Sequence, residues 1–237
     1  MVNFKDFVKF YKLAKNRNKS HQDYFKFEAF QSEIVIKELK KKWIDFKGKK
    51  VLDIGSGRGG YSYKLFEEGA YVISLDITKE YFQKTGNMNF ILGNALKMPF
   101  RSNAFDFVFC SSLIEHVKYP ELLIKEIKRI LKKGGMCYLS FPPFWSPVGA
   151  HQFKPFHYLG EKIAIILSRK FYHVRSFRYD DFYGKLRIRT IRQVKNMLIN
   201  SKFEIKSITT RMSPVNFARI PVFNEFLTWH VEFLVEK

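Results

Sequence analysis

The sequence predicts an α/β protein with a Rossmann-like, seven-stranded, mostly parallel sheet and helices on both of its faces. Three observations lead to this prediction. Short apolar segments alternate with helical segments over residues 50–141, which is typical of parallel strands joined by crossover helices. A glycine-rich run, VLDIGSGRGG, connects the first strand to the first helix. The chain has 237 residues, of which 46% are hydrophobic and 27% charged, so it can bury one substantial core and is not expected to be disordered.

A basic helical extension is expected first, over residues 1–48. Phe4, Phe7 and Tyr11 recur at helical spacing between lysines, which predicts a basic amphipathic helix. A second helical pattern covers residues 22–43. The first helix suits either a lid over a ligand site or an anionic membrane surface.

The remaining residues, 49–237, are expected to form the main domain. Its predicted strands cover residues 51–54, 71–75, 89–92, 104–110, 136–141, 203–209 and 227–235. Predicted helices cover residues 61–68, 120–133 and 191–200, with Gly134 and Gly135 ending the second. The last strand, which follows the parallel unit, is expected to be antiparallel. The alternation fails over residues 143–190, so we expect an insertion after strand five.

Positive charge is the strongest signal in the composition, because the formal net charge is +20. Residues 1–50 carry 14 Lys and Arg against 6 Asp and Glu, and residues 151–237 carry 16 against 7. This excess favours a phosphorylated substrate, an anionic membrane surface or nucleic acid as partner. A lysine-rich composition without functional meaning remains an alternative.

The sequence predicts a cytoplasmic protein, with peripheral membrane contact as an option. No apolar stretch is long enough for a transmembrane helix, and the N-terminus lacks the apolar run of a signal peptide. Cys110 and Cys137 lie in predicted strands, which suits buried thiols in a reducing compartment. Neither the cysteines nor the six histidines show metal-ligand spacing, so no metal site is predicted.

The glycine-rich run matches two different ligand-binding patterns. Gly55, Gly57 and Gly60 match the dinucleotide pattern G-x-G-x-x-G, whereas Asp53, Gly55 and Gly57 match the D-x-G-x-G pattern of methyltransferases. A carboxylate at Asp53 can accept from an ammonium group but would repel a pyrophosphate, which favours the second pattern. Asp76 ends the next strand and is placed to accept from ribose hydroxyls. Turn capping is the structural alternative for both carboxylates.

Residues 50–142 resemble the class I S-adenosylmethionine-dependent methyltransferase superfamily, especially its ubiquinone- and menaquinone-biosynthesis group. The resemblance is carried by VLDIGSGRGG, VISLDIT, GNALKMPFRSNAFDFVFCSSLIEHV and EIKRILKKGGMCYLSFP. It implies S-adenosyl-L-methionine as cofactor. The resemblance implies that its methionine part is held by Asp53, Gly55, Ser56 and Gly57, and its ribose by Asp76 and Ile77. It also implies that the adenine is contacted by Asn94 and Ala95, and the sulfonium end by Ser111. Asn94 stands where the family usually has Asp, and its side-chain carbonyl can still accept from the adenine amino group.

The methyl acceptor is expected beyond the carboxyl ends of strands four and five, so residues 143–190 form the acceptor-side insertion. His116, His151 and His157 are the candidate general bases, because a hydroxyl acceptor needs a base and histidine titrates near neutral pH. A structural role is the alternative for each. Arginines, among them Arg187 and Arg189, lie between aromatic residues over 169–195 and favour an anionic acceptor.

These observations predict O-methylation of an anionic small-molecule or lipid-linked acceptor, with sugars and glycans among the candidates. An RNA methyltransferase that uses the basic flanks is the first alternative. No N/D-P-P-Y/F amino-methylation motif follows strand four, which weighs against it. A non-catalytic cofactor-binding protein is the second alternative, and the intact D-x-G-x-G motif and Asp76 weigh against that one.

Overall fold

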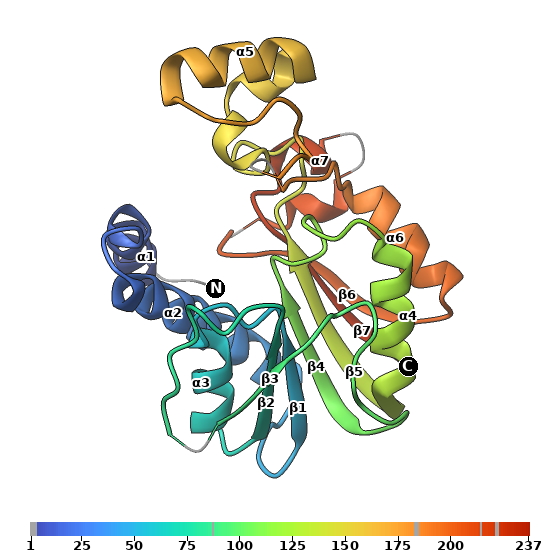
Figure 1. Ribbon diagram of the computed structural model, residues 1–237. Coiled ribbons are helices and arrows are strands. Elements are labelled where there is room, and N and C mark those ends of the chain that lie inside the picture. The colour runs from blue at the N-terminus through green and yellow to red at the C-terminus, as the bar shows by residue number, and fades with distance from the viewer. Residues whose placement is uncertain (1–3, 87, 183–184, 214, 221–222) are drawn as a thin grey trace.

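The computed structural model describes residues 4–86, 88–182, 185–213, 215–220 and 223–237. A seven-stranded sheet in the order β3-β2-β1-β4-β5-β7-β6 forms its centre (Figure 1). The strands are β1 Lys50–Ile54, β2 Tyr71–Asp76, β3 Asn89–Leu92, β4 Phe105–Ser111, β5 Leu131–Phe141, β6 Glu204–Thr210 and β7 Val231–Glu236. Only β7 runs against its neighbours, β5 and β6. The predicted fold class is therefore confirmed.

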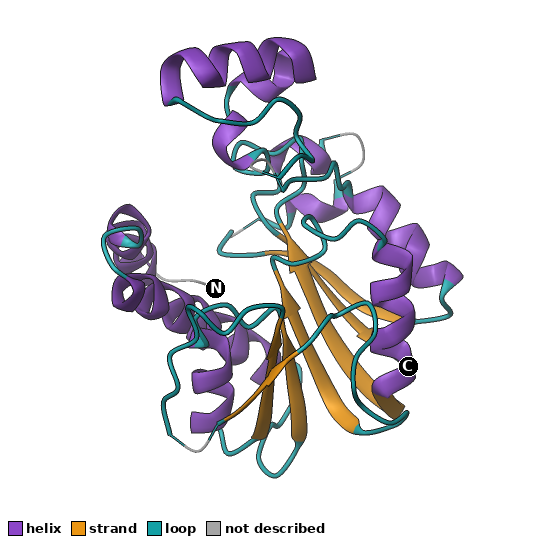
Figure 2. Cartoon of the chain, viewed as in Figure 1, coloured by secondary structure: helices purple, strands orange, loops and turns teal. Residues whose placement is uncertain are grey.

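Helices flank the sheet on both faces (Figure 2). They are α1 Phe4–Asn16, α2 His21–Lys40, α3 Gly60–Glu67, α4 Pro120–Ile130, α5 Glu161–Tyr172, α6 Ile191–Asn200 and α7 Asn224–Leu227, with 3-10 turns at His151–Phe153, Phe156–Leu159 and Phe217–Arg219. Within the described residues, none of the helices has the length and apolar character needed to cross a bilayer.

Each face of the sheet has its own apolar core. On one face, α2 and α3 contribute Val35 and Leu65, which pack with Val51 of β1. On the other face, α4 and α6 pack against alternate residues of the same strands, such as Leu52 and Val108. Burial on both faces explains why the central strands β1 and β4 are mostly apolar. Cys110 and Cys137 are buried free thiols within these strands.

The chain leaves α4 earlier than the sequence indicates, so the predicted glycine cap at Gly134 and Gly135 is wrong. The helix ends at Ile130, and β5 begins at the next residue, where Leu131 pairs with Phe105 of β4. The Ala104 N–H also donates to the Ile130 carbonyl at 2.7 Å. Pairing with β4 therefore draws the backbone into the sheet before the glycines are reached.

The last predicted strand is also shorter than expected. Residues 224–227 form α7, and β7 starts only at Val231. The Thr228 N–H donates to the Asn224 carbonyl at 3.2 Å, which closes the helical turn. Apolar side chains at 226–229 therefore belong to the surface above the sheet rather than to the strand.

Residues 143–190 form a separate layer beyond the carboxyl end of β5, at the top of Figure 1. This insertion has a small core of its own, to which Phe144, Phe153, Ala164 and Leu186 belong. It contains the 12-residue helix α5, where the sequence indicated no regular structure. Residues 183–184 lie outside the described part of the chain.

The N-terminal extension packs through α2. The Phe10 ring of α1 lies 5.5 Å from the Phe27 ring of α2, while the side chains of Phe7 and Tyr11 are exposed. The Phe4 side chain lies outside the described part of the chain. Helix α2 shares a core with the sheet. The division of the chain near residue 48 stays a prediction from sequence.

Candidate active site

The site lies where the strand order reverses direction. Strands β1 and β4 are neighbours, but β1 continues to β2 and β3 on one side, whereas β4 continues to β5 on the other. The loops after these two strands therefore diverge, and in open α/β sheets ligands bind in the crevice that this leaves. Residues 55–59 follow β1, and residues 112–119 follow β4.

The loop after β1 takes a backbone path that requires glycine. Gly55, Gly57 and Gly59 have φ values of +71°, +53° and +88°, which side chains with a Cβ rarely adopt. The Gly57 N–H donates to a carboxylate oxygen of Asp76 at 2.9 Å, so the loop is tied to the end of β2. The Ser56 hydroxyl is buried and has no hydrogen-bond partner among the described residues. An unpaired buried hydroxyl next to a turn of this kind is a candidate ligand contact.

Asp53 lies beneath this loop rather than at its surface. Its carboxylate accepts a 2.6 Å hydrogen bond from the Ser62 hydroxyl, which itself accepts from Ser74 at 2.7 Å. Burial raises the pKa of the Asp53 carboxyl to about 7. The predicted contact between Asp53 and an ammonium group stays a prediction.

Asp76 and the residues after β2 and β3 line the same edge of the sheet. The two carboxylate oxygens of Asp76 accept from the N–H groups of Gly57 and Thr78, at 2.9 and 3.2 Å. A carboxylate has about four acceptor positions, so Asp76 can still accept from hydroxyl groups. The adjacent Ile77 side chain is 75% exposed. Such an exposed apolar side chain beside a carboxylate suits a nucleoside.

Asn94 and Ala95 follow β3, as the sequence indicates. The Asn94 side-chain oxygen accepts from the Leu96 N–H at 2.9 Å, so its first role is to hold the turn. The Asn94 side chain is exposed and Ala95 is half-buried. Contact between these residues and an adenine stays a prediction.

Helix α2 covers the glycine-rich loop, and sequence reasoning missed this. A Cβ built on Gly60 would lie 2.5 Å from the Glu28 Cβ and 2.6 Å from the Ala29 nitrogen, so the two helices touch at backbone distance. The Glu28 carboxyl accepts from the Gly60 N–H at 3.3 Å, and burial raises its pKa to about 8. The helical pattern of residues 22–43 was visible, but nothing in it indicates contact with Gly60.

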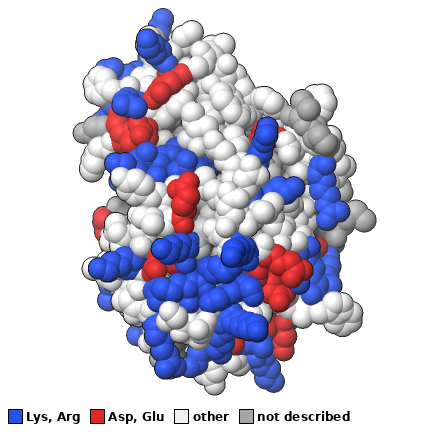
Figure 3. All heavy atoms as spheres, turned by 90° about the vertical axis from the view of Figure 1, so that its right-hand side faces the viewer, with Lys and Arg blue, Asp and Glu red and all other residues white. Residues whose placement is uncertain are grey.

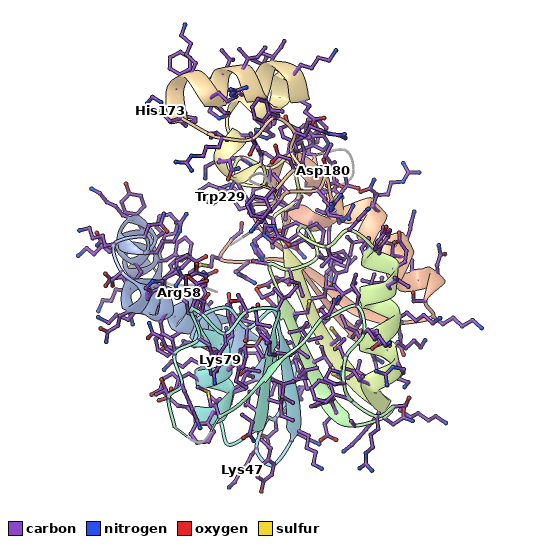
Figure 4. All side chains as sticks on the ribbon, viewed as in Figure 1. Lys47, Arg58, Lys79, His173, Asp180 and Trp229 are labelled. Carbon is purple, nitrogen blue, oxygen red and sulfur yellow. The ribbon has the colours of Figure 1, made fainter. Side chains whose placement is uncertain are left out.

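Arg58 connects the same helix to the loop from the other direction. Its guanidinium lies 3.9 Å from the centre of the Tyr24 ring of α2. Figure 4 shows Arg58 beside α2, and Trp229 at the base of the insertion. Arg58 therefore packs the glycine-rich loop against α2.

Three potential proton acceptors meet on the β4 side of the crevice. Nitrogen or oxygen atoms of Glu115, His116 and His151 all lie within 4.8 Å of one another. The Glu115 side chain is 1% exposed, and neither carboxyl oxygen has a hydrogen-bond partner among the described residues. Burial raises the pKa of Glu115 to about 7 and, together with the nearby His116, lowers the pKa of His151 to about 4.

The insertion holds this cluster in place. Nδ1 of His116 lies 2.6 Å from the Lys185 carbonyl oxygen, which can only accept, so Nδ1 carries the proton and Nε2 the free lone pair. The Arg187 N–H donates to the Glu115 carbonyl at 2.8 Å. The side chain of Arg189 donates to the carbonyls of Ile114 and Val117. Residues 185–189 are thus fastened along the loop after β4.

Two arginines of the predicted anion-binding cluster have structural partners. Arg187 forms an ion pair with Asp180 at 2.9 Å, and Arg189 binds the backbone carbonyls described above. Figure 4 shows Asp180 on the opposite side of the insertion from His173. Both arginines therefore stabilise the insertion in this structure.

His157 does not join the other two histidines. Its side chain is fully buried, and its ring centre lies 5.6 Å from that of Phe144 in a T-shaped contact. Burial lowers the pKa of this imidazole. His116 and His151, in contrast, face each other with ring centres 5.3 Å apart.

Arg211 is a further residue that sequence reasoning missed. Its buried guanidinium donates to the hydroxyls of Ser111, Ser140 and Tyr138 at 3.1, 2.7 and 2.8 Å, and it pairs with Glu232 at 3.0 Å. Arg211 therefore holds Ser111, the predicted neighbour of the sulfonium, at the end of β4. Its position one residue after β6 was the only available signal.

The central part of the chain is similar to known methyltransferases. Residues 52–139 match a family model described as a methyltransferase domain. A biotin biosynthesis bifunctional protein, BioHC, from Cellvibrio japonicus is 35% identical over 96 residues, which cover 38% of this chain and 19% of that protein. An uncharacterized methyltransferase from Mycobacterium leprae is 29% identical over 119 residues, 48% of this chain and 44% of that one. The chain thus spans less than half the length of these two relatives.

A solved structure extends the similarity beyond the matched motifs. The S-adenosylmethionine-dependent methyltransferase from Mesorhizobium loti superimposes with a TM-score of 0.61, covering 84% of this chain and 96% of that one at 18% identity. Identity at this level shows a shared fold. The chain thus contains a segment, residues 52–139, that matches a methyltransferase domain, and it shares the fold of S-adenosylmethionine-dependent methyltransferases.

Proposed function

We propose that this protein is an S-adenosylmethionine-dependent methyltransferase that acts on an oxygen atom of an anionic small-molecule or lipid-linked acceptor. One observation carries the proposal. The glycine-rich loop and the Glu115, His116 and His151 cluster occupy the two sides of the β1–β4 crevice. A cofactor held on the first side would face an acceptor held on the second.

The residues on the β1 side fit S-adenosylmethionine. The unpaired Ser56 hydroxyl and the Glu28 carboxyl lie at the glycine-rich loop, where they suit the polar methionine part. Asp76 retains acceptor positions for the ribose, and the exposed Ile77 offers an apolar surface to the purine. When bound, the cofactor supplies a methyl group made electrophilic by a positively charged sulfur.

The residues on the β4 side suit a hydroxyl acceptor. Nε2 of His116 carries a lone pair, because Nδ1 is bound to the Lys185 carbonyl, and His151 lies opposite it. These nitrogens can accept a hydrogen bond from a hydroxyl and hold its oxygen in one orientation. In this proposal His116 and His151 position the acceptor, while His157 supports the insertion from its core.

The surface of the insertion favours a lipid-linked acceptor and peripheral membrane contact. On α5, Ile163 and Ile166 are 50% and 64% exposed and lie three residues apart, and Leu159 in the preceding 3-10 turn is 55% exposed. Lys162 and Lys170 lie on the same helix. An exposed apolar stripe with neighbouring lysines is typical of a helix that lies on an anionic membrane, and α5 is the element farthest from the sheet in Figure 1.

One observation favours RNA as a second candidate acceptor. Figure 3 shows Lys and Arg side chains gathered on the face of the molecule that carries α4 and α6. These helices contribute Lys125, Lys128, Arg129, Arg192 and Lys195. A basic face of this kind suits a phosphate backbone.

Cofactor binding is tested first, by isothermal titration calorimetry with S-adenosylhomocysteine. We expect micromolar affinity, about −8 kcal/mol, and at least a tenfold loss in the Asp76→Ala variant, because the ribose hydroxyls lose their acceptor. Asp45→Ala is the matched control, since Asp45 is exposed and precedes β1 at the opposite edge of the sheet. Tight binding of a nicotinamide dinucleotide without binding of S-adenosylhomocysteine would contradict the proposal.

The acceptor is tested by incubating the protein with methyl-labelled S-adenosylmethionine and three substrate pools. These are lipid-linked sugar phosphates, their water-soluble headgroups and total RNA. Label in the first two pools supports the proposal. Label in RNA alone would replace it with the second candidate.

A further inference from the structure

Hydrogen bonds among the described residues do not account for the convergence of side chains on the β4 side of the crevice. The cluster combines two imidazoles, from His116 and His151, with the carboxyl group of Glu115. Glu115 and His116 follow β4, whereas His151 opens the first 3-10 turn of the insertion. Two distant segments thus direct nitrogen and oxygen atoms toward one point.

We propose that Glu115, His116 and His151 form a binding site for a zinc-type divalent metal ion. Two histidines and one glutamate are a donor set of catalytic zinc sites, which keep a further position open for water or substrate. Magnesium and calcium prefer sites made entirely of oxygen atoms. The nitrogen donors therefore select for a first-row transition metal.

The dimensions of the cluster suit such an ion after a small closure. Zinc lies about 2.0–2.2 Å from nitrogen and oxygen ligands, which puts tetrahedral ligand atoms about 3.4 Å apart. The ligand atoms here lie within 4.8 Å of one another. His151 is only half-buried, so rotation of its side chain can bring it closer to the other two ligands, by up to the roughly 1.4 Å that this geometry requires, without moving the sheet.

Glu115 provides an independent indication of a missing partner. Both of its carboxyl oxygens are buried, and neither has a hydrogen-bond partner among the described residues. A buried carboxyl group without a partner is costly, and buried charges are usually paired or bind metals. A divalent cation at the centre of the cluster would supply the missing interaction.

The second nitrogen of His116 is also arranged as in known metal sites. Nδ1 donates to the Lys185 carbonyl at 2.6 Å, which fixes the ring and presents Nε2. Metal-binding histidines almost always donate their other N–H to a carbonyl or carboxylate in this way. The Arg187 N–H, bound to the Glu115 carbonyl at 2.8 Å, holds the neighbouring ligand.

The role of the ion deepens the proposed function and rests on it. Binding of the ion is independent of the proposed function. An open coordination position would hold the oxygen of the acceptor hydroxyl. A Lewis acid there lowers the pKa of that hydroxyl, and its proton passes to solvent. The same position would also bind a carboxylate or phosphate oxygen, which suits an anionic acceptor.

The test is a titration of the purified, metal-free protein with Co²⁺, followed by visible absorption, and with Zn²⁺, followed by calorimetry. We expect one ion per chain, with no competition from a large excess of Mg²⁺. His151→Asn should weaken binding at least about tenfold, because even changes to residues that only orient a metal ligand cost 10–100-fold. Glu115→Gln should weaken it as well, without creating a cavity.

His173→Asn is the matched control. His151 and His173 both belong to the insertion and both have left-handed backbone conformations, with φ of +49° and +53°, which asparagine tolerates. His173 lies exposed at the far end of α5 (Figure 4), so its loss should leave metal affinity unchanged. Circular dichroism checks that each variant is folded.

Three results would overturn the metal proposal. They are the absence of stoichiometric Co²⁺ or Zn²⁺ binding, equal affinity in His151→Asn and the parent protein, and equal losses in His151→Asn and His173→Asn. S-adenosylhomocysteine affinity is measured on the same samples. Cofactor binding without metal binding refutes only this inference, whereas metal binding without cofactor binding refutes the proposed function.

Discussion

Replacing Glu28 with glutamine should make the protein more stable, and the gain should grow with pH. Glu28 is half-buried and holds its carboxyl against the glycine-rich loop, and its pKa rises from 4.5 to about 8 on folding. Between these values the folded protein binds more protons than the unfolded chain, so the carboxyl makes the free energy of unfolding fall as pH rises. Glutamine cannot ionise but keeps an oxygen that accepts from the Gly60 N–H.

The size of the effect follows from the pKa difference. Each unit is worth about 1.4 kcal/mol, so Glu28→Gln should gain about 3 kcal/mol at pH 7 and about 4 kcal/mol at pH 8.5, relative to its effect at pH 4.5. Urea denaturation of both proteins at several pH values between 4.5 and 8.5 measures this difference. Other titrating groups, including Asp53 and Glu115, are present in both proteins and largely cancel.

Glu33→Gln is the control, because Glu33 is exposed on the same helix. Its effect on the free energy of unfolding should be small and nearly independent of pH. The reasoning is refuted if Glu28→Gln changes stability by the same amount at pH 4.5 and pH 8.5, or if its advantage shrinks as pH rises.

Two further substitutions test the contacts around the crevice. Gly60→Ala places a Cβ 2.5 Å from the Glu28 Cβ and should displace α2. The free energy of unfolding should fall by about 1–3 kcal/mol, and S-adenosylhomocysteine should bind more weakly. Unchanged cofactor affinity would show that α2 does not shape the site. Arg211→Met leaves the partly buried Glu232 without its cation and should cost about 3–5 kcal/mol by urea denaturation. A loss below about 1 kcal/mol would contradict the structural role assigned to this arginine.

Elements with strong local signals were predicted closely. β3 covers the predicted residues Asn89–Leu92, and α6 covers Ile191–Asn200, where Thr190 caps the helix. Apolar spacing and capping residues act within a few positions of the chain, so they are visible in the sequence. The predictions erred where a distant partner decided the boundary, as at Leu131, which pairs with Phe105.

The cofactor side of the site was more accessible to sequence reasoning than the acceptor side. Gly55, Gly57 and Asp76 follow the first two strands of the sheet, and consecutive strands of a parallel unit end at the same edge. The acceptor side instead depends on the course of the insertion. His157, one of three candidate bases, is buried in the insertion's core, while His151 reaches His116.

The sequence by itself determined the alternation of strands and helices, the glycine-rich turn and the position of the carboxylate after β2. Each depends on the conformational limits of a residue or on a period of burial along one segment. Only the tertiary structure brought Glu28 to Gly60, Arg211 to Ser111, and His151 to Glu115 and His116. These contacts join segments that are far apart in the chain, and their geometry depends on how α2 and the insertion pack on the sheet, which no local pattern encodes.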